Sequence, residues 1–225
     1  KDFNNWMKLS NVSTNCFDRY MDYLRDMDFP EDSIEKMTKA TNDILARCAD
    51  PNNLNDHKNS KKKGLVMGDI QSGKTANYTA LINLAADYGY KVIVLLAGMT
   101  DSLREQTQKR IDSGFIGAKS DTISSSIINF VGVGKEENKY YAIPLTNVNS
   151  DFGKVVRENQ NTNSSDFNKP LILVIKKNKS VLTQVKDYLK PGIHGITSEN
   201  ILIIDDEADN ASVNTKNSDD PSIIN

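Results

Sequence analysis

Cysteine, histidine and tryptophan are scarce in this chain, and their scarcity removes several classes of function. The 225 residues include two cysteines, two histidines and one tryptophan. Cys16 and Cys48 have no C-x-x-C partner, so we expect buried thiols in a reducing cytosol rather than a disulfide or a zinc site. His57 and His194 stand alone in the sequence, which argues against a histidine-based metal cluster.

Long apolar runs are also missing. No stretch approaches the ~20 consecutive apolar residues of a membrane span, and residues 1–5 lack the apolar segment of a signal peptide. We therefore expect a cytoplasmic protein with no membrane partner. The first residue is not Met and residues 221–225 form no obvious final element, which suggests a piece of a longer protein. The formal net charge of −2 gives no overall sign of nucleic-acid binding, although it is compatible with a local basic surface.

One motif stands out from this background. Residues 68–75 match G-x-x-x-x-G-K-[ST], the phosphate-binding loop: Gly68-Asp69-Ile70-Gln71-Ser72-Gly73-Lys74-Thr75. An apolar run at 64–67 precedes the motif and a helical pattern at 76–86 follows it. A strand, a glycine-containing turn and a helix direct backbone N–H groups and a helix N-terminus at one anion. We predict a nucleoside triphosphate site in which Lys74 reaches the β- and γ-phosphates and the Thr75 hydroxyl binds Mg²⁺.

After residue 64, apolar runs alternate with helical stretches, which predicts an α/β domain with a mainly parallel sheet flanked by helices. The predicted strands are 64–67, 91–96, 127–133, 170–175 and 201–204. Besides 76–86, helices are predicted from Thr100 or Asp101 to the glycine of Ser113-Gly114, and over 181–189. The Asn- and Ser-rich segment 134–169 predicts an irregular insertion with a hairpin around 140–145.

Residues 1–57 form a predicted N-terminal helical region, and residues 58–225 the nucleotide-binding lobe. Phe17, Tyr20, Met21 and Leu24 share one helical face, with Thr14 as the expected N-cap. A second apolar stripe runs from Ile34 to Cys48. The polar segment 52–63 is the expected linker. Its basic end, residues 58–63, is interpreted as a solvated segment, with contact to a phosphate backbone as the alternative.

The strand predicted at 201–204 runs into Asp205-Asp206-Glu207-Ala208-Asp209. Aliphatic residues followed by acidic ones are typical of a Walker B segment, which presents carboxylates at the ligand-binding end of a sheet. One carboxylate holds Mg²⁺ and another polarises the attacking water. We assign Asp206 to the metal and Glu207 to the water, because the glutamate then occupies the general-base position. The alternative register assigns Asp205 to the metal and Asp206 to the water.

The D-E-A-D run after a strand, with a phosphate loop upstream, resembles the first RecA-like lobe of superfamily-two helicases. Residues 67–78 are similar to the phosphate loop of a bacterial ATPase family called the Z-one domain, whose members are described as candidate endonucleases. The blocks 97–107, 174–178 and 205–212 are similar to further segments of that family, in the same order. The helical residues 1–57 carry no comparable similarity.

The resemblance implies an ATP-driven motor on DNA in a bacterial restriction or phage-defence system, with ATP rather than GTP as the nucleotide. Family members are associated with nuclease and Hsp90-type ATPase partners. In helicase lobes the block after the second strand contacts nucleic acid, which makes Thr100, Arg104 and Gln106 candidates. A second RecA-like lobe would supply an arginine worth ~10³–10⁵ in rate, and none follows in this chain. The alternatives are an endonuclease with a regulatory nucleotide site and a nucleotide-gated interaction module.

Overall fold

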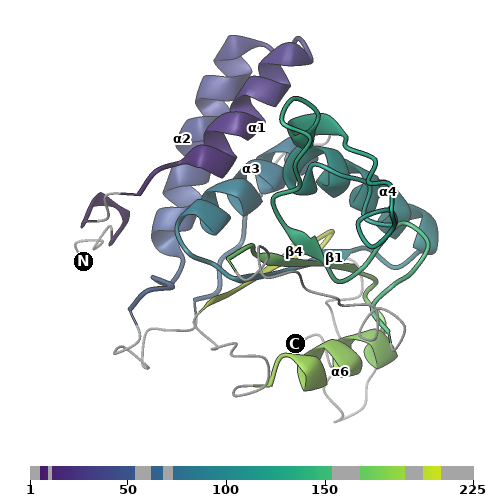
Figure 1. Ribbon diagram of the computed structural model, residues 1–225. Helices are drawn as coiled ribbons and strands as arrows, with labels where there is room; N and C mark the ends of the chain where they lie inside the picture. Colours follow the sequence, from purple (N-terminus) through teal and green to yellow (C-terminus); the bar gives the residue numbers. More distant parts are fainter. Residues whose placement is uncertain are drawn as a thin grey trace.

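A four-stranded parallel sheet lies at the centre of the protein, with helices on both faces (Figure 1). The structure is a computed structural model and describes residues 6–9, 12–53, 62–67, 73–153, 168–190 and 200–208. The strands are β1 (Val92–Ala97), β2 (Ile143–Pro144), β3 (Leu171–Ile175) and β4 (Ile201–Asp206), in the order β2-β3-β1-β4. The α/β class expected from the alternating pattern is confirmed at this level.

The register aligns the carboxyl ends of the three longer strands. Val92 lies opposite Leu171 of β3 and Ile201 of β4, and every pairing in the sheet is parallel. At the far end, Ala97 of β1 lies opposite Asp206 of β4. The segments that leave β1, β3 and β4 therefore emerge side by side at one edge of the sheet.

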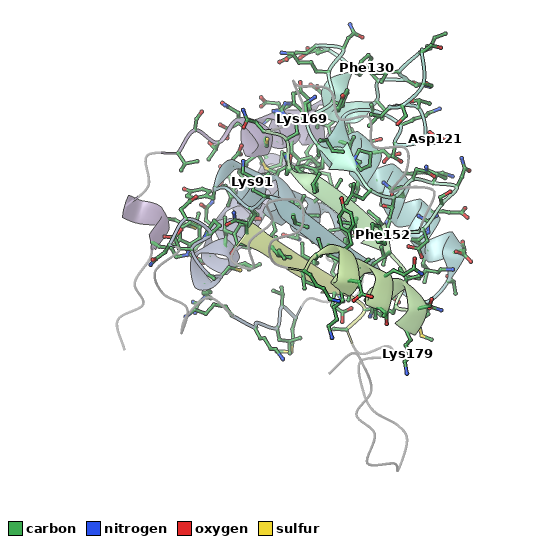
Figure 2. All side chains as sticks on the ribbon, turned by 60° about the horizontal axis from the view of Figure 1, so that its bottom comes forward. Lys91, Asp121, Phe130, Phe152, Lys169 and Lys179 are labelled. Atoms are coloured by element: carbon green, nitrogen blue, oxygen red, sulfur yellow. The ribbon has the colours of Figure 1, made fainter. Side chains whose placement is uncertain are left out.

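Alternate side chains of the central strand β1 pack into two hydrophobic cores, one on each face of the sheet, as expected for a strand that is apolar throughout. Ile93 and Leu95 pack with α1 (Asn15–Asp26), α2 (Glu31–Arg47), α3 (Lys74–Asp87) and Ile111 of α4 (Asp101–Ile111). Val92 and Val94 pack with α6 (Lys179–Tyr188) and with the buried ring of Phe152, which lies beside α6 (Figure 2). Figure 1 shows the first four helices on one side of the sheet and α6 on the other.

The N-terminal helices share their core with the helix that follows the phosphate loop. The buried residues of α1 and α2 belong to the same cluster as those of α3. The Asp87 carboxylate at the end of α3 accepts the backbone N–H groups of Cys16 and Phe17, both at 2.9 Å, and so caps α1. Thr14 is the N-cap residue of α1, as expected, but its hydroxyl makes no capping hydrogen bond and donates to the Asp18 carboxylate instead.

The strand expected at 64–67 is not formed. Leu65, Val66 and Met67 are 75%, 65% and 87% exposed, and no strand is assigned to them. A strand needs a neighbour for its N–H and C=O groups. β1 is flanked by β3 and β4, and residues 64–67 do not pair with any strand of the described sheet. In the same way β4 lies at the edge of the described sheet, with Ile203 62% exposed, rather than in its buried centre.

Two further strand predictions need correction. Residues 127–133 form no strand. Ile127 is 80% exposed, Phe130 makes only an isolated bridge to Ala118, and a 3-10 turn, η3, follows (Gly132–Gly134). Instead, the strand that pairs with the outer edge of β3 is β2, which lies within residues 140–145, where a hairpin was expected. The Ile143 N–H donates to the Pro170 carbonyl at 2.9 Å, which sets 143–144 parallel to β3.

The helix expected to start at Thr100 or Asp101 starts after Thr100, whose hydroxyl accepts the Leu103 N–H. Its expected end at Gly114 is wrong. The chain continues beyond α4 as the π-helical turn η2 (Asp112–Ile116) and stops at Gly117, which has φ +89° and so suits glycine. A short 3-10 turn, η1 (Trp6–Leu9), precedes α1. Of the described helices, none has both the length and the apolar composition needed to cross a membrane.

Candidate nucleotide and metal site

Of the residues predicted to bind nucleotide and metal, Asp206 and Glu207 lie at the carboxyl edge of the sheet, where β4 ends. Two residues labelled in Figure 2 mark the two edges of the sheet. Lys91 comes just before β1, at the amino edge, and Lys179 begins α6 just beyond the carboxyl end of β3. Open α/β sheets bind their ligands outside the carboxyl ends of the strands. The ends of β1, β3 and β4 lie at this edge. Tyr78, one turn into α3, packs in the same core as residues of β1.

The end of the phosphate loop is the start of α3. Gly73 is the N-cap residue and has φ +71°, a left-handed conformation that favours glycine. Lys74 is exposed at the first position of the helix, and Thr75 follows it half-buried. The five preceding residues of the motif lie outside the described residues: Gly68, Asp69, Ile70, Gln71 and Ser72. Of the motif, the structure describes Gly73, Lys74 and Thr75, which form the start of α3.

Tyr78, one turn into α3, brings the phosphate-loop threonine and the acidic segment together. Its side chain is buried in the same core as Ala97, which ends β1 and lies opposite Asp206 in the sheet. Burial raises the pKa of the Tyr78 phenol, Thr75 lowers it in part, and the charge of Asp206 adds to the rise. The helix that begins at the phosphate-loop motif is thus packed against the end of the sheet that carries the acidic motif.

Arg110 is a residue of this site that the sequence analysis did not single out. Its guanidinium donates a hydrogen bond to the Thr75 hydroxyl oxygen at 2.9 Å. Arg110 lies in the last turn of α4 and is exposed. Nothing in the local sequence distinguishes it from the other basic residue of that turn, so only the packing of α4 against α3 reveals the contact.

Lys177 holds the acidic segment in place through two contacts of its buried ammonium group. Its side chain is fully buried, and its ammonium forms an ion pair with Asp205 at 2.7 Å and donates to the Glu207 carbonyl at 2.5 Å. The Lys177 backbone N–H donates to the Gly98 carbonyl at 2.9 Å. One residue therefore links the ends of β1, β3 and β4. Lys177 lies within the block 174–178 that resembles the Z-one family, and the resemblance implies no role for it.

Asp206 and Glu207 follow Asp205 in the acidic segment. Asp206 is half-buried and accepts the Glu207 N–H at 3.1 Å. Burial raises the pKa of Asp206, and the Glu207 N–H opposes the rise. Glu207 is exposed and has φ +56°, an uncommon conformation for a residue with a side chain that is often found at functional sites. Its carboxylate lies next to Gly98, at the end of β1.

The three candidates for nucleic-acid contact fall in different environments. Thr100 and Gln106 are exposed, the first at the N-cap of α4 and the second two turns further on. Arg104 is buried, and its guanidinium donates to the carbonyls of Asn147 and Val148 at 2.8 and 2.7 Å. Arg104 thus anchors the loop after β2 and presents no cation at the surface in this structure.

The oxygen atoms gathered here suit magnesium bound together with a nucleotide. Thr75 offers a hydroxyl and Asp206 a carboxylate, and Mg²⁺ in nucleotide sites is held by one or two such side chains plus phosphate oxygens and water. Across the described ranges no group of three or more His, Cys, Asp or Glu side chains could hold a metal ion by itself. The donor set therefore fits a metal that arrives with phosphate rather than one in an all-protein cage.

Searches against protein-family models, curated proteins and solved structures find no match to this chain. The functional argument consequently depends on the motifs and on the geometry just described.

Proposed function

We propose that this chain is the ATP-binding and ATP-hydrolysing lobe of a helicase-like DNA translocase, with a RecA-like P-loop fold. One observation carries the proposal: α3, which begins with Lys74 and Thr75, packs through Tyr78 into the same core as Ala97 at the end of β1, and Ala97 lies opposite Asp206 of the acidic motif. A phosphate loop and a Walker B carboxylate must meet in this way to share one Mg²⁺ ion.

In the proposed site each residue has a defined task. Lys74 binds the β- and γ-phosphates, Thr75 and Asp206 hold the metal, and Glu207 orients and polarises the attacking water. Bound Mg²⁺ neutralises charge that develops on the phosphate oxygens. The ion pair between Lys177 and Asp205 supports this register over its alternative, because it commits Asp205 to a buried cation.

The setting of the lobe follows from the resemblance to the Z-one family. It places the chain in a bacterial restriction or phage-defence system, with DNA as the substrate and a second RecA-like lobe as the source of a catalytic arginine. Thr100 and Gln106, exposed on α4, remain the proposed DNA contacts, since phosphate contacts require donors at an accessible surface. Nuclease or Hsp90-type partners belong to the same proposal.

The test is ATP binding by calorimetry, followed by turnover with and without DNA. Lys74→Ala should weaken ATP binding about 10- to 100-fold, the value of one or more charge-assisted hydrogen bonds. Lys91→Ala, at the opposite edge of the sheet, is the matched control and should leave binding unchanged. Equal affinity of the two variants would overturn the phosphate-loop assignment.

Glu207→Gln separates hydrolysis from binding and the motor from its alternatives. It should preserve ATP binding and remove DNA-stimulated turnover. Metal-dependent DNA cleavage that survives Glu207→Gln would favour an endonuclease with a regulatory nucleotide site. ATP-dependent binding of a partner protein, with no effect of DNA on turnover, would favour an interaction module.

A further inference from the structure

The Tyr78 hydroxyl is a buried polar group with no hydrogen-bond partner in the part of the chain that the structure describes. The residue as a whole is 9% exposed, and its ring belongs to the core between α1, α3 and β1. A buried hydroxyl without a partner lowers the stability of the folded state. The group therefore needs an explanation that packing does not supply.

Phenylalanine would serve the core equally well. Its ring fills the same volume and makes the same apolar contacts, and it carries no hydroxyl to desolvate. Tyr90, another core tyrosine, satisfies its hydroxyl by donating to the Ala49 carbonyl at 2.5 Å. The difference between the two residues lies in location, because Tyr90 follows the end of α3 whereas Tyr78 lies one turn after its start.

The surroundings of the Tyr78 hydroxyl are those of the candidate metal site. Thr75 and Tyr78 are three residues apart on α3, so their side chains lie on the same face of the helix. Tyr78 packs in the same core as Ala97, which lies opposite Asp206 at the end of the sheet, and both Asp206 and Thr107 act on the pKa of the Tyr78 phenol. Of these neighbours Asp206 is the strongest acceptor, because an ionised carboxylate binds a hydroxyl donor more strongly than a neutral oxygen does.

We propose that the Tyr78 hydroxyl is a positioning donor, which hydrogen-bonds the Asp206 carboxylate and orients it toward Thr75 when the two residues hold Mg²⁺ with a nucleotide. Hydrogen bonds behind a metal ligand fix its orientation, and removing them usually costs 10- to 100-fold in metal affinity. This inference rests on the proposed function and adds a residue to it. Tyr78 itself touches neither metal nor nucleotide.

Tyr78→Phe tests the inference, with Tyr90→Phe as the matched control. ATP affinity is measured by calorimetry in EDTA and over a series of MgCl₂ concentrations, and melting temperature is measured without ligand. For Tyr78→Phe we expect unchanged affinity in EDTA, a Mg²⁺ requirement raised about 10- to 100-fold, and an unchanged or higher melting temperature. For Tyr90→Phe we expect an unchanged Mg²⁺ requirement and a melting temperature lowered by about 2–4 °C.

The possible failures are distinguishable. If wild-type protein binds ATP and Tyr78→Phe has the wild-type Mg²⁺ requirement, the positioning role is refuted and the proposed function stands. A lower melting temperature for Tyr78→Phe, with unaltered Mg²⁺ dependence, would show that the hydroxyl is structural and would also refute the role. If wild-type protein binds no ATP at any Mg²⁺ concentration, the proposed function fails and the inference fails with it.

Discussion

Replacement of Lys177 by methionine should cost far more stability than a surface lysine does. The Lys177 side chain is 0% exposed, and its ammonium contacts both the Asp205 carboxylate and the Glu207 carbonyl. Methionine keeps most of the buried stem but leaves a partly buried carboxylate without its cation. Breaking a buried pair by removing one partner typically costs 3–5 kcal/mol.

The estimate for this pair lies at the lower end of that range. Asp205 is 27% exposed, so water compensates part of the lost interaction. We expect a loss of about 3 kcal/mol, which for a chain of this size corresponds to a melting temperature lower by about 6–12 °C. The loss should shrink when Asp205→Asn is added, because the double variant no longer buries an unpaired charge.

Urea unfolding measures the effect, and the neighbouring residue supplies the control. Lys176 pairs with Asp101 at 2.7 Å, but Asp101 is 68% exposed, so Lys176→Met should cost about 1 kcal/mol or less. If Lys177→Met costs no more than Lys176→Met, Lys177 does not organise the acidic segment as described. Equal losses in the single and double variants would also contradict the reasoning.

Three further predictions concern metal competition, pH and the N-terminal helices. Arg110→Ala should lower the Mg²⁺ concentration needed for ATP binding about 2- to 5-fold, because guanidinium and metal compete for the Thr75 oxygen; a higher requirement would refute this competition. Burial raises the pKa of Asp112 to about 6 from 3.8. The folded state therefore binds this proton more tightly, and the free energy of unfolding should fall by up to about 3 kcal/mol as pH rises from about 4 to 6. Asp112→Asn should flatten that dependence in urea titrations, and an unchanged slope would contradict the assignment. Asp87→Ala should lower the free energy of unfolding by about 1–2 kcal/mol through loss of the α1 cap, and an unchanged value would show that the cap contributes nothing.

The sequence predicts those elements whose pattern does not depend on distant partners. The apolar run that forms β1 predicts a buried strand, and the apolar runs of β3 and β4 likewise predict strands, although β4 lies at the edge of the described sheet. Helices α3 and α6 follow from their apolar periodicity. Thr100 was a correct N-cap because the bond from the Leu103 N–H is local.

The failures share a cause, since each depends on contacts that sequence periodicity does not encode. Residues 64–67 and 127–133 have the composition of strands, but no described strand edge pairs with the first and only an isolated bridge with the second. The short strand β2 exists because β3 offers an edge to residues 143–144. The cap of α1 comes from Asp87, far along the chain, and could not be read from the residues around Thr14.

The candidate site divides in the same way. Lys74, Thr75, Asp206 and Glu207 are candidates because a motif fixes their residue types and spacing, and their roles stay predictions. Lys177, Arg110 and the Tyr78 hydroxyl could not, because each acts across elements that only the fold brings together. Arg104 shows the reverse error: its residue type suits nucleic acid, whereas its burial assigns it to a loop anchor.

The central claim is that Asp206, and not Asp205, joins Thr75 in one Mg²⁺·ATP site. It is tested most directly by ATP calorimetry over a MgCl₂ series for Asp206→Asn and Asp205→Asn. The account predicts that Asp206→Asn abolishes the Mg²⁺ dependence of ATP binding, while Asp205→Asn keeps that dependence and lowers stability. The opposite pattern, with Mg²⁺ dependence lost only in Asp205→Asn, would contradict the account.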